Sequence, residues 1–139
     1  MKPIYPAKFV KDQDGGYFVQ FIDIPEAMTD GETREEAELN ARDALNGILG
    51  YLLDSGKDIP DPSSTTGPDI TGIVPDAQVQ AALLIRKQRG GKPLSDLARA
   101  LDTSWPAAQR LENPHHWPTL KQLDRAAAVM GKRLVLCLE

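Results

Sequence analysis

The chain has 139 residues, of which 41% are hydrophobic and 26% are charged, a composition typical of a globular protein and unlike that of a disordered chain. No apolar run approaches the roughly 18 residues that cross a bilayer, and Met1-Lys2-Pro3 lacks the apolar stretch of a secretion signal, so we expect a cytoplasmic protein. The single cysteine, Cys137, has no disulfide partner, and the apolar run VLCL predicts a buried thiol there rather than a nucleophile.

The formal net charge of −4 is divided unevenly along the chain. Residues 1–75 contain 6 Lys and Arg against 14 Asp and Glu, a net −8, whereas residues 76–139 contain 10 against 6, a net +4. An acidic half and a basic half suggest two partners of opposite charge, one cationic and one polyanionic. The alternative is that both halves are merely solvated surfaces.

The first half begins with a predicted β-hairpin. Residues 4–10 alternate along the chain in the way that a half-buried strand requires, and Asp14-Gly15-Gly16 supplies the positive-φ residues of a tight turn. Residues 17–22 return as a β-branched and aromatic strand. Ile24-Pro25 interrupts this run, and a short third strand is expected at 27–29.

A long helix follows this predicted sheet. Asp30-Gly31 predicts another turn, and Thr33 and Glu36 have the spacing of a capping box. Apolar residues then recur every three to four positions, which predicts an amphipathic helix over 34–54 that ends near Gly56. The expected inner face consists of Ala37, Ala41, Ala44, Leu45, Ile48 and Leu52.

The middle of the chain predicts a domain boundary near residue 75. Residues 58–69 are rich in Pro, Ser and Thr and predict a linker loop, after which 70–74 is expected to return as a strand to the hairpin sheet. Asp76 is then expected to cap a helix that reaches about Arg89 and ends at Gly90-Gly91. The predicted domains are 1–57 with 70–75, an α+β domain, and 76–139, a helical domain.

The second half predicts a helix-turn-helix. In residues 94–101, LSDLARAL, apolar side chains recur at i, i+3, i+4 and i+7, and Asp102-Thr103 leaves room only for a tight turn. Ser104 is a good N-cap, and a proline is tolerated in the first turn of the helix that follows. Two short helices joined in this way have the geometry that places the second helix in the major groove of DNA.

The chemistry of that second helix favours DNA contact. Trp105 and Pro106 lie at its start, where an apolar surface can pack on thymine methyls or sugars, and Arg110 projects from the same face towards a guanine edge or a phosphate. The alternative is that Trp105 packs on a neighbouring helix and Arg110 only solvates the surface. The predicted DNA-binding residues are Ser104, Trp105, Pro106, Ala107, Gln109, Arg110, Asn113 and Lys121.

The end of the chain predicts a further helix and a strand. Thr119 is expected to cap a helix that ends at Gly131, and RLVLCL, residues 133–138, predicts a short strand. Because one such helix rarely binds DNA tightly enough alone, we expect a homodimer or higher oligomer, with this strand pairing across the two-fold axis. The expected dimerisation residues are Arg133, Leu134, Val135, Leu136, Cys137 and Leu138; the alternative is an edge strand on its own domain.

Two family resemblances support this organisation. LSDLARALDTSWPAAQRLEN followed by WPTLKQLDRAAAVMGKRLVLCL resembles the helix-turn-helix of Cro/repressor-like (XRE) proteins, although Asp102 stands where that family usually has glycine. DGGY-F-V-F, then DIPEAMTDGET-EEA and a long helix ending in Leu-Leu-Asp, resembles the antitoxin HicB. Members of that family often carry a helix-turn-helix after this domain.

The resemblance to HicB implies a truncated ribonuclease H-like first domain that binds a small basic mRNA-cleaving toxin, HicA, and a second domain that represses the shared promoter. The acidic and basic halves fit that division. On this reading no catalysis and no cofactor are expected. The residues predicted to bind the toxin are Asp23, Ile24, Pro25, Glu26, Asp30 and Glu32.

Other function classes remain open. A repressor that senses a small ligand would have no toxin partner, and a ribonuclease H-like nuclease would use the carboxylates of residues 23–32 to hold two metal ions. The spacing of those carboxylates is not diagnostic, and a solvated or docking role is the simpler interpretation. His115 and His116 are adjacent and have no nearby cluster of ligands, so no metal site is expected there.

Overall fold

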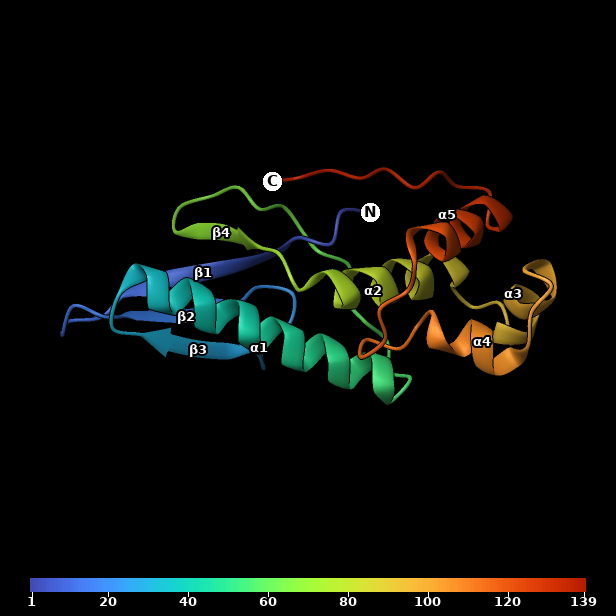
Figure 1. Ribbon diagram of the computed structural model, residues 1–139. Coiled ribbons are helices and arrows are strands. Elements are labelled where there is room, and N and C mark those ends of the chain that lie inside the picture. The colour runs from blue at the N-terminus through green and yellow to red at the C-terminus, as the bar shows by residue number, and fades with distance from the viewer. The chain divides into compact units, whose positions relative to one another are not determined.

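The computed structural model describes residues 1–139 and divides the chain into two compact units (Figure 1). Unit 1, Met1–Asp76, contains a sheet and one long helix, and unit 2, Ala77–Glu139, contains four helices. The expected order of an α+β part followed by a helical part is confirmed. None of the helices is long and apolar enough to span a membrane.

Four antiparallel strands form the sheet of unit 1, in the spatial order β3-β2-β1-β4. Their bounds are β1 (Tyr5–Lys11), β2 (Tyr17–Phe21), β3 (Met28–Gly31) and β4 (Ile70–Ile73). β1 and β2 form the predicted hairpin, and Gly15 in the turn between them has a φ of 91°, which favours glycine. β4 pairs with the other edge of β1, so the chain returns to the sheet after the long helix, as predicted.

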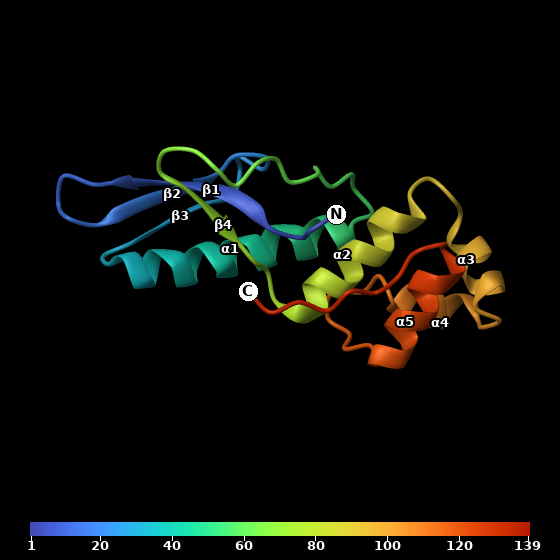
Figure 2. The same cartoon turned by 90° about the horizontal axis from the view of Figure 1, so that it is seen from above.

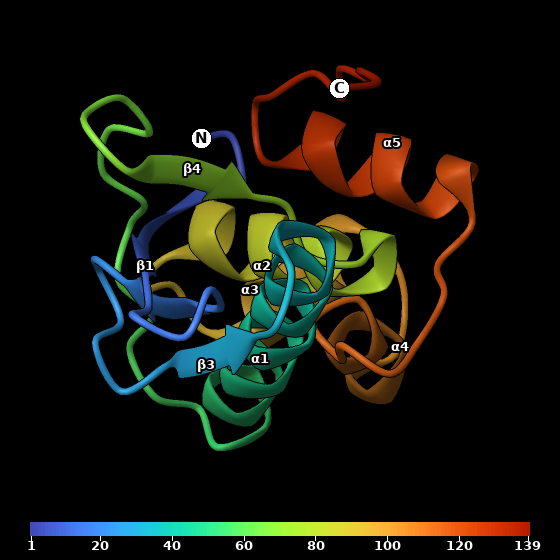
Figure 3. The ribbon, with the colours of Figure 1, turned by 90° about the vertical axis from the view of Figure 1, so that its left-hand side faces the viewer.

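The helix α1 (Arg34–Asp54) covers one face of this sheet (Figures 2 and 3). The Thr33 hydroxyl accepts a hydrogen bond from the Glu36 amide at 3.1 Å, which confirms the predicted start. Gly56, with a φ of 67°, ends the helix as predicted. Arg34 fixes the first turn to the sheet: its guanidinium lies 3.9 Å from the centroid of the Phe9 ring.

The buried face of α1 differs in part from the predicted one. It consists of Ala37, Ala41, Leu45, Leu49, Gly50 and Leu53. Ala44, Ile48 and Leu52, which were expected inside, are only partly buried. The reason is that α1 presents a narrow ridge of residues four positions apart to the sheet, whereas the sequence shows only a broad apolar stripe.

The predicted turn at Asp30-Gly31 is wrong, because both residues belong to β3. Gly31 is buried, and a Cβ atom at this position would lie 2.4 Å from the backbone nitrogen of Ala37. Glycine is therefore required here by the close approach of the first turn of α1 to the sheet, not by a turn conformation.

Residues 58–69 form a loop, as predicted, and connect α1 to β4 within unit 1. Two contacts attach this loop to the sheet. The Tyr5 hydroxyl donates to the carbonyl of Pro60 at 2.7 Å, and the Asp23 carboxylate accepts from the amide and the hydroxyl of Ser63 at 2.9 and 3.1 Å. Burial, and secondarily the carboxylates of Asp61 and Asp23, raise the pKa of the Tyr5 phenol.

Unit 2 consists of α2 (Ala77–Arg89), α3 (Leu94–Ala100), α4 (Trp105–Arg110) and α5 (Leu120–Val129). One apolar cluster holds these helices together. Its buried members are Ile85, Leu97, Leu101, Leu111 and Ala126, with Leu94, Leu123 and Met130 packed around them. The cluster takes its members from α2, α3 and α5 and from Leu111 at the end of α4, whereas Leu120, whose spacing also predicts an inner position on α5, is 62% exposed.

The predicted strand at the end of the chain is wrong for the single chain. Residues 133–138 form no strand, and Val135 and Leu138 are 81% and 101% exposed. Cys137 is also exposed, which corrects the expectation of a buried thiol. The physical reason is that a strand needs an edge with which to exchange backbone hydrogen bonds, and the helices of unit 2 offer none. For the same reason the alternative of an edge strand on its own domain is wrong.

Candidate functional site

The turn between α3 and α4 is tight and well defined. Asp102 has a φ of 52°, in the left-handed region. The Thr103 amide donates to the Ala98 carbonyl at 3.0 Å, and the Asp102 amide donates to the Arg99 carbonyl at 3.0 Å, the two bonds of a Schellman motif. Asp102 thus takes the conformation that glycine usually takes in such a turn, as its short polar side chain permits.

The helix α4 begins at the predicted cap. The Ser104 hydroxyl accepts a hydrogen bond from the Ala107 amide at 3.2 Å, and a proline occupies the first turn. Ala108 and Leu111 are buried, at 0% and 6% exposure, and attach the helix to the core of unit 2. The opposite side of α4 is therefore exposed to solvent.

The predicted DNA-binding residues lie largely on that open side. Trp105 is 48% exposed, and the side chains of Pro106, Gln109 and Arg110 are also exposed. Ser104, Asn113 and Lys121 are exposed as well, whereas Ala107 is half-buried. One short helix therefore presents an aromatic ring and a guanidinium to solvent.

Two of these residues also serve local structure. Ser104 caps α4, so its oxygen is already an acceptor within the chain. The Asn113 side-chain oxygen accepts from the His115 amide at 2.9 Å and shapes the loop before α5. In both residues the side-chain oxygen already accepts a hydrogen bond. Only the Ser104 hydroxyl hydrogen and the Asn113 amide hydrogens therefore remain to donate to a phosphate.

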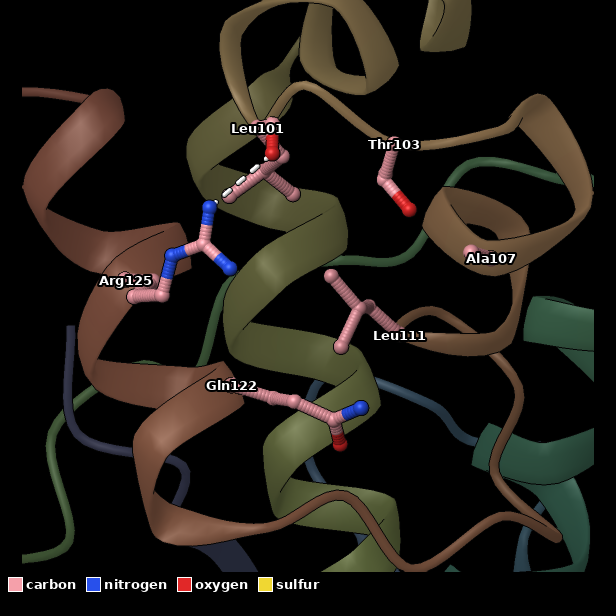
Figure 4. Close-up of a pocket in the computed structure, with 6 residues that line it drawn as sticks. All are labelled: Leu101, Thr103, Ala107, Leu111, Gln122 and Arg125. Atoms are coloured by element: carbon pink, nitrogen blue, oxygen red, sulfur yellow. Dashed lines mark hydrogen bonds between the residues drawn. The ribbon is translucent and has the colours of Figure 1, made fainter.

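Arg125 of α5 holds the turn between α3 and α4 in place. Its guanidinium donates to the Leu101 carbonyl at 3.0 Å, at the end of α3 (Figure 4). The surrounding pocket has a volume of about 90 Å³ and is lined by Leu101, Thr103, Ala107, Leu111, Gln122 and Arg125. In the sequence Arg125 is only one of the ten Lys and Arg residues of 76–139, whereas the structure gives it a positioning role at the turn.

An ion pair fixes the other end of α4. Arg89 at the end of α2 donates from Nε and Nη2 to the two Glu112 oxygens at 2.5 and 2.8 Å, and the side chains are only 18% and 9% exposed. The hydrogen bonds to Glu112 raise the pKa of Arg89. Sequence reasoning missed this pair because its members lie 23 residues apart and no local pattern connects them.

The acidic segment 23–32 divides into three parts. Pro25, Glu26, Asp30 and Glu32 are exposed and available to a partner. Asp23 is half-buried and holds Ser63 of the 58–69 loop. Ile24 is 2% exposed and belongs to the core, so the prediction of a partner contact is wrong for its side chain.

The exposed loop before α5 carries further side chains without an assigned role. Trp117 is 67% exposed and His115 is exposed too. No group of three or more His, Cys, Asp or Glu side chains in the structure is arranged to hold a metal ion.

Comparison with known proteins identifies a family over both units. Residues 4–78 match the family described as HicB_like antitoxin of bacterial toxin-antitoxin system. The antitoxin HicB of Escherichia coli K12 is 34% identical over 133 residues, which cover 95% of this chain and 96% of the relative. Antitoxin HicB 2 of Photorhabdus laumondii is 34% identical over 132 residues, 95% of this chain and 94% of that protein.

Solved structures of the same kind of protein are similar as well. The crystal structure of the Burkholderia pseudomallei antitoxin HicB is 20% identical, with a TM-score of 0.48, over 77% of this chain and 90% of that one. The N-terminal domain of that antitoxin is 26% identical, with a TM-score of 0.47, over 52% of this chain and 98% of that one.

Proposed function

We propose that this chain, which belongs to the HicB-like family of bacterial antitoxins, neutralises a small basic HicA-like ribonuclease that cleaves mRNA and represses its own operon by binding operator DNA. The observation that carries this proposal is the division of charge between two separate units. Unit 1 holds most of the acidic residues, and unit 2 holds an excess of Lys and Arg together with an open α4.

Unit 1 is the proposed toxin-binding unit. A net charge of −8 over residues 1–75 attracts a cationic protein and suits a partner whose own ligand is RNA. Glu26, Asp30 and Glu32 are exposed and make no ion pair within the chain, so a cationic partner can bind them without displacing an internal contact.

Unit 2 is the proposed DNA-binding unit. The Schellman turn at Asp102, the Ser104 cap and the Arg89–Glu112 pair hold α4 in a fixed orientation. A fixed recognition helix loses little conformational entropy on binding, and Arg110 offers two donors that fit a guanine edge.

A homodimer is part of the proposal. The exposed apolar side chains of residues 133–138 have the composition of a strand but no partner within the chain, and pairing with the same segment of a second copy would supply one. Val135→Pro removes a backbone donor from such a pair. We expect it to convert a dimer to a monomer in sedimentation analysis; an unchanged mass would exclude this mode of assembly.

The DNA-binding proposal is tested at Arg110. Arg110→Ala should weaken binding to the DNA upstream of the chain's own reading frame by about 1 to 3 kcal/mol and reduce its preference for that DNA over unrelated DNA. Arg99→Ala is the matched control, because Arg99 is an exposed arginine outside α4. It should leave the sequence preference intact, and equal loss of preference in both variants would contradict the role of Arg110.

The toxin-binding proposal is tested by co-expression with the small protein encoded next to the chain's own reading frame. The full chain should copurify with it and protect mRNA from it. A chain that binds the operator but not this protein would instead support the second candidate, a repressor that senses a small ligand. The 90 Å³ pocket beside Arg125 is small for a metabolite, since ligand sites usually reach about 300 Å³ or more.

A further inference from the structure

One face of the sheet of unit 1 is covered by α1 (Figure 2). On the opposite face the 58–69 loop lies near β4, where Pro6 is fully buried and Thr65 lies against Gly72, while parts of β1, β2 and β3 remain exposed. Side chains alternate along each strand, so Phe9, Val19 and Phe21 point towards α1 and are at most 3% exposed. The alternate positions point away from it. The large apolar side chains there are Val10, Phe18, Ile22 and Met28, which are 45%, 44%, 45% and 52% exposed.

The strand register gathers these four side chains into one surface, the sheet-face patch. Val10 on β1 is directly opposite Phe18 on β2. Met28 on β3 is opposite Gln20, which places it one diagonal step from both Phe18 and Ile22. Large apolar side chains that are contiguous and half-exposed are typical of interaction sites, whereas single ones need no explanation.

The charged side chains around the sheet-face patch are mostly carboxylates, beside one exposed lysine on the same face, Lys8, which is opposite Gln20. Asp30 on β3 is directly opposite Phe18. Asp12 and Asp14 lie in the turn that follows Val10, and Glu26 lies in the loop between β2 and β3. All four are exposed, and none makes an ion pair within the chain. An apolar centre with a charged rim is the usual anatomy of a protein interface.

We propose that the sheet-face patch and this rim are the docking surface for the cationic toxin, an inference that rests on the proposed function. Charge decides between the possible occupants. A second copy of unit 1 would bring another net −8 against the same carboxylates, whereas a basic protein neutralises them while its own apolar side chains cover Phe18 and Met28. The docking surface is thus wider than the acidic segment 23–32 and centres on the strands.

The test compares two variants of the full chain. Phe18→Thr combined with Met28→Thr removes the centre of the sheet-face patch and keeps a β-branched residue in each strand. Leu39→Gln is the matched control, because Leu39 is 61% exposed on α1, outside the sheet-face patch. Binding to the small protein encoded beside the chain's reading frame is measured by calorimetry. The double variant should bind about tenfold more weakly or worse, and the control should bind as the unaltered chain does.

Each outcome has a distinct meaning. If the unaltered chain binds and the double variant binds equally well, the docking surface is elsewhere, although the proposed function stands. If the unaltered chain does not bind, the proposed function itself fails. A double variant with a smaller mass in the absence of the toxin would show that the face joins copies of this chain. If the double variant does not fold, Asp14→Asn with Asp30→Asn should still reduce the association rate and its salt dependence, and no reduction would overturn the proposal.

Discussion

The Arg89–Glu112 pair allows a quantitative prediction about how α4 is held. Glu112→Gln keeps the shape of the side chain but removes its charge and replaces one acceptor with a donor. Exposed ion pairs contribute about 0 to 1 kcal/mol, and breaking a fully buried pair costs about 3 to 5 kcal/mol. The two side chains are 18% and 9% exposed and share two charge-assisted hydrogen bonds, so this pair lies between those limits. We expect Glu112→Gln to lower the free energy of unfolding by about 2 kcal/mol.

The assay is differential scanning calorimetry of the full chain, in which the transition of unit 2 should shift downwards by about 10 °C. Glu38→Gln is the matched control, because Glu38 pairs with Arg34 at 3.0 Å but is 48% exposed, and its loss should cost less than about 0.5 kcal/mol. If the two variants lose similar amounts of stability, the argument from burial is refuted and the pair does not hold the end of α4.

Further predictions concern unit 1. Gly31→Ala places a Cβ atom 2.4 Å from the Ala37 nitrogen and should destabilise the unit by about 3 kcal/mol in urea unfolding, whereas Gly47→Ala, in open space on α1, should stabilise it by about 0.5 to 1 kcal/mol. Because the pKa of Tyr5 is raised in the folded state, the unfolded chain loses this proton first, so stability should fall as the pH rises above about 10. Tyr5→Phe should cost about 1 kcal/mol at pH 8, through loss of the bond to Pro60, and should flatten that decline; an unaltered slope would contradict the assignment.

Local signals in the sequence predict most of the elements. The capping serine and threonine residues and the terminal glycines mark the ends of α1, α4 and α5 because they act through neighbouring backbone groups. The short turn at Asp102 follows from the same kind of local chemistry. The exposed face of α4, and with it the candidate DNA contacts, could be predicted because only Ala108 and Leu111 share an inward face.

Contacts between distant residues could not be predicted in this way. Gly31 was predicted to lie in a turn because glycine is common in turns. Glycine is also common where two backbone segments approach closely, and only the position of α1 shows that this second reason applies. Asp23 was predicted to contact a partner, but its carboxylate accepts a hydrogen bond from the amide of Ser63, which lies 40 residues further along the chain. The sheet-face patch was missed because strand alternation shows which residues share a face but not which face the helix covers. The strand expected at 133–138 would need a neighbouring strand edge, and the helices of unit 2 offer none.

The exposed tryptophans of unit 2 provide an intrinsic fluorescence signal for binding events. Both indole groups, Trp105 and Trp117, lie in unit 2, and unit 1 contains none. Emission excited selectively from indole therefore records events at unit 2, with Trp105 at the leading edge of α4. Occupation of α4 by DNA should quench and blue-shift this light, whereas a tryptophan-free toxin bound to the sheet should leave it unchanged. Titrating the two partners in either order would thus read out, without any label, whether neutralisation and repression influence each other.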